Sequence, residues 1–177
     1  MFIRKKTISK KEYAYLVENK WRKRRKNKVK QKTLKYLGKV YKLEKINNQE
    51  QKPVNAEQYT TTQPKKIILE RIRREIQTHG FQETKKNIFE KENKLINLTK
   101  CNVKDKKTKK QLCLEINNNF FCSYTLRKLI HFIPKQGLTD LEIGKQLATA
   151  FESAGVSIPK ELFVILAQKI LKEGDKP

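Results

Sequence analysis

The sequence is poor in the residues that build several common kinds of protein site. It contains three cysteines, Cys101, Cys113 and Cys122, and this number is too small and odd for a disulfide framework. Their spacing also lacks the close cysteine pairs that structural zinc sites use. We therefore expect reduced thiols and no bound metal.

The chain also lacks the usual marks of an enzyme. Its only aspartates are Asp105, Asp140 and Asp175, which lie in a lysine-rich turn, at a predicted helix start and near the C-terminus. Metal-dependent nucleases and transposases need carboxylates that converge on their metals, and these three are scattered. The six glycines form no phosphate-binding motif. We therefore predict no catalytic residues, no cofactor and no enzymatic activity.

Long apolar runs are absent as well. No run approaches the roughly 18 residues that a membrane-spanning helix needs. The first residues, MFIRKKTISKK, lack the apolar core of a signal peptide. These absences predict a cytoplasmic protein without a membrane partner.

Acidic residues are scarce, and the resulting positive charge is unevenly distributed. The chain has 42 Lys and Arg against 18 Asp and Glu, a formal net charge of +24. Residues 1–45 hold 18 basic and 3 acidic residues, whereas residues 134–177 hold 6 of each. A genome rich in AT raises the lysine content everywhere, but it does not explain this gradient. We expect the N-terminal end to meet an anionic partner and the C-terminal end to pack.

A basic hairpin is the central prediction for the N-terminal end. Alternation of apolar with polar residues predicts antiparallel strands over 2–8, 12–22 and 29–37, with a tip at 24–27. Three strands can fold independently, whereas a bare hairpin is marginal. Like charges concentrated at one hairpin tip repel one another, so they are unfavourable for folding. The tip therefore indicates a polyanionic partner.

We predict that this hairpin contacts the phosphates of a nucleic acid. The single tryptophan would either stack on a base or lie half-buried in the sheet. The predicted contact residues are Lys20, Trp21, Arg22, Lys23, Arg24, Arg25, Lys26, Lys28, Lys30 and Lys32. A second lysine-rich turn adds Lys107, Lys109 and Lys110, for which an ordinary solvated loop is the alternative.

Three N-terminal segments resemble a known family in their order and spacing. They are MFIR at the start, YLVE at 15–18 and QKTLKYLGK at 31–39. Together they resemble the first segment of insertion-sequence transposases of the acidic-triad type, and also the start of short, mostly uncharacterised archaeal proteins. We expect no counterpart of the transposase catalytic domain here. The resemblance therefore implies DNA contact and says nothing about strand cleavage.

Beyond the hairpin, the sequence predicts a polar linker and a mixed domain. Residues 46–64 carry little apolar content and end in a proline, which is typical of a flexible linker. The predicted fold class is α+β: a small N-terminal antiparallel sheet with a basic hairpin over 1–45, this linker, and a C-terminal domain over 65–177. That domain is expected to contain a β-hairpin over 111–124 and several helices.

The other elements expected in the C-terminal domain are short. Apolar spacing predicts a helix over 65–79, with Arg71, Arg73 and Arg74 on its exposed or flanking surface. Short strands are expected at 88–89 and 95–98. A helix is also expected after the hairpin, with Ser123 or Thr125 as its cap.

A helical hairpin is predicted at the C-terminal end. The sequence TDLE at 139–142 matches a capping box with Thr139 as the N-cap. Gly155 should end this helix, and a second helix should begin near Pro159. We expect the second helix to bury Phe163, Ile165, Leu166 and Ile170. Residues 139–171 are therefore a candidate surface for a protein partner or for self-association.

These features together predict a non-catalytic nucleic-acid-binding protein, with DNA slightly favoured over RNA. Two alternatives stay open. A basic ribbon also suits an RNA- or ribosome-associated protein, because it can contact the backbone of folded RNA. The chain would instead be a protein-interaction adaptor if the C-terminal helices recruit a partner and the basic end only localises it.

Overall fold

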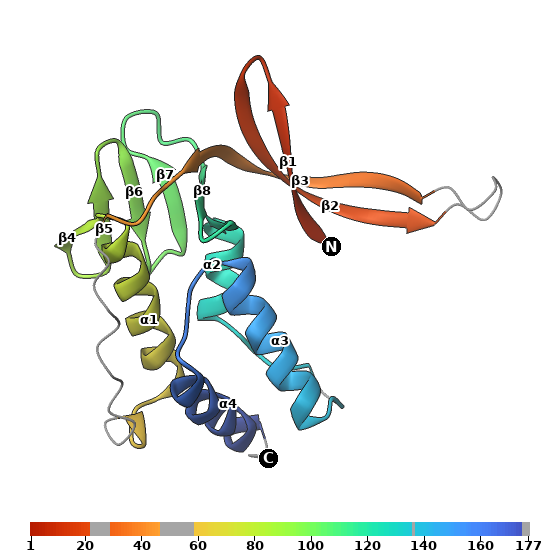
Figure 1. Ribbon diagram of the computed structural model, residues 1–177, viewed down its shortest axis with the longest axis vertical. Helices are drawn as coiled ribbons and strands as arrows, with labels where there is room; N and C mark the ends of the chain where they lie inside the picture. The colour runs from red at the N-terminus through yellow and green to blue at the C-terminus, as the bar shows by residue number, and fades with distance from the viewer. Residues whose placement is uncertain (22–28, 47–58, 136, 175–177) are drawn as a thin grey trace.

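The computed structural model describes residues 1–21, 29–46, 59–135 and 137–174. Within these residues the chain forms a five-stranded sheet, a four-stranded sheet and four helices (Figure 1). The predicted α+β class is confirmed. Most of the predicted linker, residues 47–58, lies outside the described residues.

The N-terminal strands form the predicted antiparallel sheet. They are β1 (Phe2–Ile8), β2 (Lys11–Trp21) and β3 (Val29–Lys42), with β2 in the middle. Ser9 and Lys10 both have positive φ, which matches the two-residue hairpin turn that right-twisted strands favour. The predicted hairpin tip at 24–27 lies outside the described residues.

β3 runs through Gly38, where its register against β2 shifts between the pairs Ala14–Gly38 and Tyr15–Tyr36. The strand then joins the rest of the molecule. It pairs in parallel with β8 (Leu112–Ile116), which pairs antiparallel with β9 (Asn119–Cys122). Gly38 has a φ of +136°, and a Cβ there would lie 2.7 Å from the backbone oxygen of Gln111. Only glycine allows the two strands this approach. The N-terminal strands and the predicted hairpin at 111–124 therefore form one sheet, in the order β1-β2-β3-β8-β9.

This sheet is strongly curved. The ammonium of Lys5 in β1 lies 2.9 Å from a carboxylate oxygen of Glu115 in β8, although β2 and β3 lie between the two strands. Neighbouring strands are about 4.8 Å apart, so a flat sheet would leave the two side chains too far apart to pair. The face that carries Lys5 and Glu115 is therefore concave.

An apolar cluster lines this concave face. Its buried members are Ala14, Leu16, Leu37, Val40, Cys113 and Cys122. Cys113 and Cys122 are directly opposite across β8 and β9, and both are free thiols. The hydrogen bond with Cys122, together with burial, raises the pKa of Cys113. That thiol accordingly stays protonated at neutral pH.

The second sheet is an antiparallel meander. It contains β4 (Gln82–Lys85), β5 (Ile88–Lys91), β6 (Lys94–Asn97) and β7 (Asn102–Asp105), in chain order. β5 and β6 match the predicted short strands. β4 and β7 were not predicted, because their residues are mostly polar and give no apolar alternation.

Four helices lie below the strands in the view of Figure 1. They are α1 (Pro64–Thr78), α2 (Ser123–Ile130), α3 (Asp140–Ser153) and α4 (Lys160–Gly174). Each corresponds to a predicted helix. Thr139 caps α3 within the predicted capping box.

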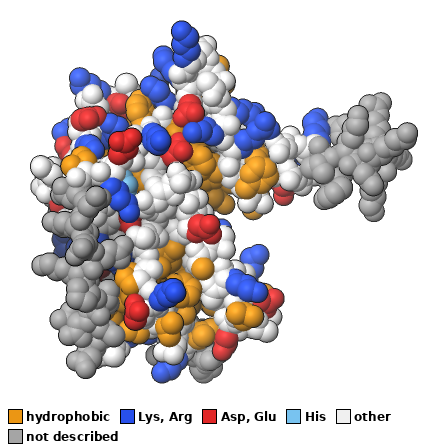
Figure 2. All heavy atoms as spheres, in the orientation of Figure 1, with side chains coloured by type: hydrophobic (Ala, Val, Ile, Leu, Met, Phe, Trp, Pro, Cys, Tyr) orange, Lys and Arg blue, Asp and Glu red, His pale blue; other side chains and the backbone are white. Residues whose placement is uncertain are grey.

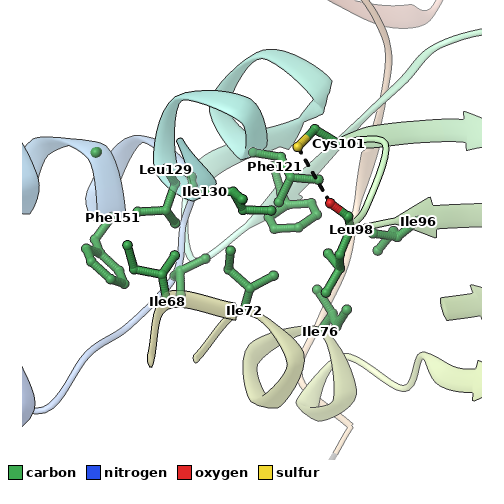
Figure 3. Close-up of a cluster of buried hydrophobic side chains, with 14 of the residues drawn as sticks. Ile68, Ile72, Ile76, Ile96, Leu98, Cys101, Phe121, Leu129, Ile130 and Phe151 are labelled. Carbon is green, nitrogen blue, oxygen red and sulfur yellow. Dashed lines mark hydrogen bonds between the residues drawn. The ribbon is translucent and has the colours of Figure 1, made fainter. Parts of the chain in front are cut away.

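The main core lies between the helices and the two sheets. Ile68, Ile72 and Ile76 of α1 all point into this cluster: Ile68 toward Phe151 of α3, Ile72 toward Phe121 of β9, and Ile76 toward Leu98 (Figure 3). The strip of isoleucines at helical spacing is the apolar face that the sequence predicts for α1. This core fixes the helices against the strand pair β8–β9.

The buried face of α4 differs from the predicted one. Leu162, Leu166 and Ile170 are buried, whereas Phe163 and Ile165 are only partly buried. The three buried positions are four residues apart and form one stripe. The helix is apolar on nearly all sides, so its pattern alone did not identify that stripe.

The prediction that Arg71 lies on the surface of α1 was also wrong. Its side chain is buried, and its guanidinium donates two hydrogen bonds to the carbonyl oxygen of Ser157, at 3.2 and 2.8 Å. The prediction placed it on the exposed or flanking surface, because a charged residue on a helix usually faces water.

Glu75, one turn further along α1, is buried beside Arg71. Its carboxylate accepts hydrogen bonds from the backbone N–H and the hydroxyl of Ser157, at 3.0 and 2.6 Å, and from Asn117 at 2.7 Å. Burial alone would raise the pKa of Glu75, but these hydrogen bonds outweigh it and lower the pKa. The group thus stays charged and ties α1 to the β8–β9 turn and the α3–α4 loop.

Candidate nucleic-acid interface

A two-stranded arm projects from the molecule where β2 and β3 extend beyond β1 (Figure 1). Its described residues are 18–21 and 29–32. Lys20 lies directly opposite Lys30, and Glu18 lies opposite Lys32. Trp21 is the last residue of β2. The remaining predicted contacts of the hairpin, Arg22, Lys23, Arg24, Arg25, Lys26 and Lys28, lie outside the described residues.

The strand register places the described arm lysines on one face. Leu16, Glu18 and Lys20 are two residues apart on β2, so their side chains point to the same side. Their partners on β3 point to that side too, because residues directly opposite in an antiparallel pair share a face. These partners are Lys35, Lys32 and Lys30, respectively. We call the surface formed by Lys20, Lys30, Lys32 and Lys35 the lysine face.

The charges of the lysine face are open to solvent. All four side chains are exposed. Among the described residues, none of the four has an acidic side chain within 4.0 Å, although Lys5, further back on the same side, pairs with Glu12 and Glu115. Like charges directly opposite across two strands, as at Lys20 and Lys30, are destabilising. Within the described part of the protein this charge is therefore not neutralised by acidic side chains.

At the root of the arm the lysine face runs into a basic groove. Lys35 of β3 lies on one side of it, and Arg127 and Lys128 of α2 lie on the other. The groove has a volume of about 280 Å³. It is also lined by Leu37, Asn102, Gln111, Ser123 and Tyr124. Three cations and several hydrogen-bonding side chains together suit a phosphate or a nucleotide.

The second lysine-rich turn belongs to the body and not to the arm (Figure 1). Lys107, Lys109 and Lys110 are exposed. Asp105 holds the turn by accepting the N–H groups of Lys107 and Thr108, at 2.9 and 2.7 Å. The hydrogen bond from Thr108, which is the largest influence, lowers the pKa of Asp105. Lys110 directly precedes Gln111, which lines the basic groove together with Lys35 of the lysine face.

Sequence reasoning missed the groove. The sequence predicts a strand that contains Lys35, but it gives no sign that Lys35, Arg127 or Lys128 contacts a ligand. Alternation along β3 is the one local signal for the interface, and it places only Lys30 and Lys32 on a common face. Nothing local relates Lys35 to α2, since the two meet only through the pairing of β3 with β8.

Basic side chains gather over the strands, and apolar side chains are conspicuous over the helices at the lower end (Figure 2). The described residues contain no group of three or more His, Cys, Asp or Glu side chains that could hold a metal ion. No helix in the described part of the chain is long and apolar enough to cross a membrane.

Comparisons of the chain with protein-family models, curated proteins and solved structures found no significant match. The resemblance of the N-terminal segments to transposase openings therefore stays a prediction.

Proposed function

We propose that this chain is a non-catalytic nucleic-acid-binding protein that grips the phosphate backbone with its arm. The observation that carries the proposal is the lysine face: exposed lysines, unpaired with described acids, on one side of a projecting ribbon. A two-stranded ribbon has the width to enter the major groove of DNA. Bound phosphates would replace the repulsion between Lys20 and Lys30 with attraction.

The groove extends the proposed interface toward the body. A backbone that follows the lysine face past Lys35 reaches Arg127 and Lys128, whose side chains would hold a further phosphate. On the resemblance of the N-terminal segments, DNA is favoured over RNA. A cytoplasmic location is part of the same proposal.

Salt dependence tests the proposal. The triple variant Lys20→Gln, Lys30→Gln and Lys32→Gln should bind a DNA duplex about a hundredfold more weakly at low salt. Each phosphate contact that is lost means that binding releases about one counterion fewer. The slope of log affinity against log salt should become shallower by about 2 to 3. Fluorescence anisotropy with labelled DNA at several salt concentrations measures both quantities.

A matched control removes three positive charges from the C-terminal helices. Lys145→Gln, Lys160→Gln and Lys172→Gln change three exposed lysines of α3 and α4, where positive and negative charges balance. This variant should keep both the affinity and the salt slope. Equal losses in the two variants would show that only total charge matters, and the arm would lose its assigned role.

A second candidate function is a protein contact through the C-terminal helices. Leu141 of α3 is 68% exposed and Val164 of α4 is 52% exposed. A contiguous exposed apolar patch would mark an interface, and these two side chains are the candidates for such a patch. We infer that a second copy of the chain covers them. Sedimentation equilibrium over a range of concentrations would detect the dimer, and Val164→Glu should abolish it.

A further inference from the structure

The N-terminal strands carry a second surface, opposite the lysine face. In β2, Tyr13 and Tyr15 alternate with Ala14 and Leu16, so the two tyrosines point to the other side of the sheet. Tyr36 lies directly opposite Tyr15 in β3 and therefore shares its face. Phe2 in β1 lies on the same side, because its partner in β2 is two residues beyond Tyr15. We call Phe2, Tyr13, Tyr15 and Tyr36 the tyrosine face.

The rings of this face are grouped and partly open to solvent. The Tyr36 ring centroid is 5.5 Å from that of Tyr15 and 6.3 Å from that of Tyr13. Tyr36 is 45% exposed and Phe2 is 42% exposed. The contacts with Tyr13 and Tyr15 hold the Tyr36 ring in place while one side of it remains accessible. A fixed, accessible ring can stack on a ligand at little cost in conformational entropy.

Cations surround the rings. The ammonium of Lys6 lies 5.1 Å from the Tyr15 ring centroid, and Arg4 lies opposite Tyr15 in the β1–β2 register. Lys39 lies opposite Tyr13. Each of the three belongs to the tyrosine face by its register position. Arg4 also donates a hydrogen bond to Gln31, and the ammonium of Lys39 lies 4.6 Å from the Tyr41 ring centroid. Phosphates next to a stacked base would accept hydrogen bonds from these cations.

Acidic residues are excluded from the tyrosine face. The strands β1, β2 and β3 contain two glutamates, Glu12 and Glu18. Both are at even-numbered positions of β2, like Leu16, and so lie on the opposite side of the sheet. Asp105 of β7 is close enough to act electrostatically on Lys39, but β1, β2 and β3 themselves place only aromatic rings, cations and uncharged side chains on this face. Such a surface is complementary to nucleobases and phosphates.

We propose that the tyrosine face stacks the unpaired bases of a single-stranded nucleic acid, while Arg4, Lys6 and Lys39 hold the adjacent phosphates. The inference rests on the proposed function for the class of ligand, and it assigns single strands to the tyrosine face, whereas the lysine face contacts the backbone of the duplex. In a duplex each base is covered by its neighbours, so only unpaired bases offer a free ring face. Because every base has such a face, binding here should tolerate many sequences.

Three ligands of equal length separate base stacking from phosphate binding. They are a thymidine oligonucleotide, the same strand with every base removed, and a DNA duplex. The wild-type protein should bind the thymidine strand roughly tenfold more tightly than the abasic strand, which is the effect of about one stacked base. Anisotropy titrations at one salt concentration measure the ratio without any variant, so no folding defect can affect it.

Variants at Tyr36 locate the effect. Tyr36→Leu should lose the preference for bases while its affinity for the abasic strand is unchanged, because the phosphate contacts remain. Tyr36→Phe keeps the ring and should keep the preference. Circular dichroism checks that both variants retain the wild-type fold.

The outcomes distinguish this inference from the proposed function. Equal binding of the thymidine and abasic strands by the wild type would overturn base stacking while leaving backbone binding intact. A preference that survives Tyr36→Leu would overturn the assignment to this face. If none of the three ligands binds at low salt, the proposed function fails, and the inference fails with it.

Discussion

The arm and the body of this protein use charged side chains in opposite ways. In the body, Arg71 and Glu75 are buried, and hydrogen bonds to Ser157 satisfy both. In the arm, Lys20 and Lys30 lie side by side, exposed and without a described acidic partner. Buried charges are retained only when the fold satisfies them. The comparison teaches that the body's charges are satisfied within the fold, whereas the described charges of the arm are left to solvent; the proposed function assigns these to a nucleic acid.

Replacing Glu75 tests the body's side of this comparison and should have the largest effect. Glu75→Ala removes the carboxylate that accepts hydrogen bonds from the Ser157 N–H, the Ser157 hydroxyl and the Asn117 amide in a buried site. Breaking such a network costs about 3–5 kcal/mol. Urea denaturation measures the free energy of unfolding. The control Glu70→Ala removes a carboxylate that pairs with Arg74 near the surface and accepts one hydrogen bond from the Tyr59 hydroxyl, and it should cost about 1 kcal/mol.

Gly38→Ala tests how the arm is joined to the body. The new Cβ would lie 2.7 Å from backbone atoms of Gln111 and Leu112, at a φ that L-residues rarely adopt. We expect a loss of about 2–3 kcal/mol as β3 separates from β8. Gly144→Ala in α3 meets no atom within 4 Å and should instead stabilise the protein by about 0.5–1 kcal/mol. Similar results for the two variants would contradict the close approach of the strands.

Acid should weaken the body through Glu75. The pKa of Glu75 in the folded protein is lowered, so the unfolded chain binds the proton more readily. This contribution to stability is fully present above the unfolded pKa and is lost as the pH falls through the folded one. The urea midpoint should therefore fall less between pH 6 and pH 3 in Glu75→Gln than in the wild type. A parallel fall in both proteins would show that Glu75 is not the responsible group.

Arg127→Ala tests whether the interface extends from the arm into the groove. Loss of one phosphate contact should weaken duplex binding roughly fivefold to tenfold at low salt and reduce the salt slope by about 1. The control is Arg74→Ala, which removes the same charge from α1, a helix that contributes no residue to the lining of the groove. If Arg127→Ala binds like the wild type, the proposed interface ends at Lys35.

Lys30→Glu should have the smallest effect on stability, and its sign is informative. The substitution places opposite charges across β2 and β3 at Lys20, which should stabilise the ribbon by a few tenths of a kcal/mol. The same change should weaken nucleic-acid binding. A protein that becomes slightly more stable while it binds less tightly would show that the arm's charge is kept at the expense of the fold. A loss of stability would contradict the register.

Local patterns in the sequence predicted the individual elements well. Alternation from Phe2 to Ile8 predicted β1, and isoleucines at helical spacing predicted α1. The capping box at Thr139 predicted the start of α3. Each of these signals depends on residues close together in the chain. β4 and β7 were not predicted, because their mostly polar residues carry no such signal.

The candidate site was predicted in part. The arm lysines Lys20, Lys30 and Lys32 follow from alternation and charge. The groove residues Arg127 and Lys128 do not, because they reach Lys35 only after β8 has paired with β3. The tyrosine face was visible as two tyrosines on one side of a strand, but the register across β1 and β3 was needed to add Phe2 and Tyr36.

The sequence by itself determined the α+β class, the hairpin of β2 and β3 and the gradient of positive charge, since periodicity and composition are properties of neighbouring residues. Only the tertiary structure decided which distant segments meet. It joined β3 to β8 at Gly38 and buried Arg71 against Ser157. Such choices depend on backbone pairing and on the cost of burying charge, and a linear pattern carries neither.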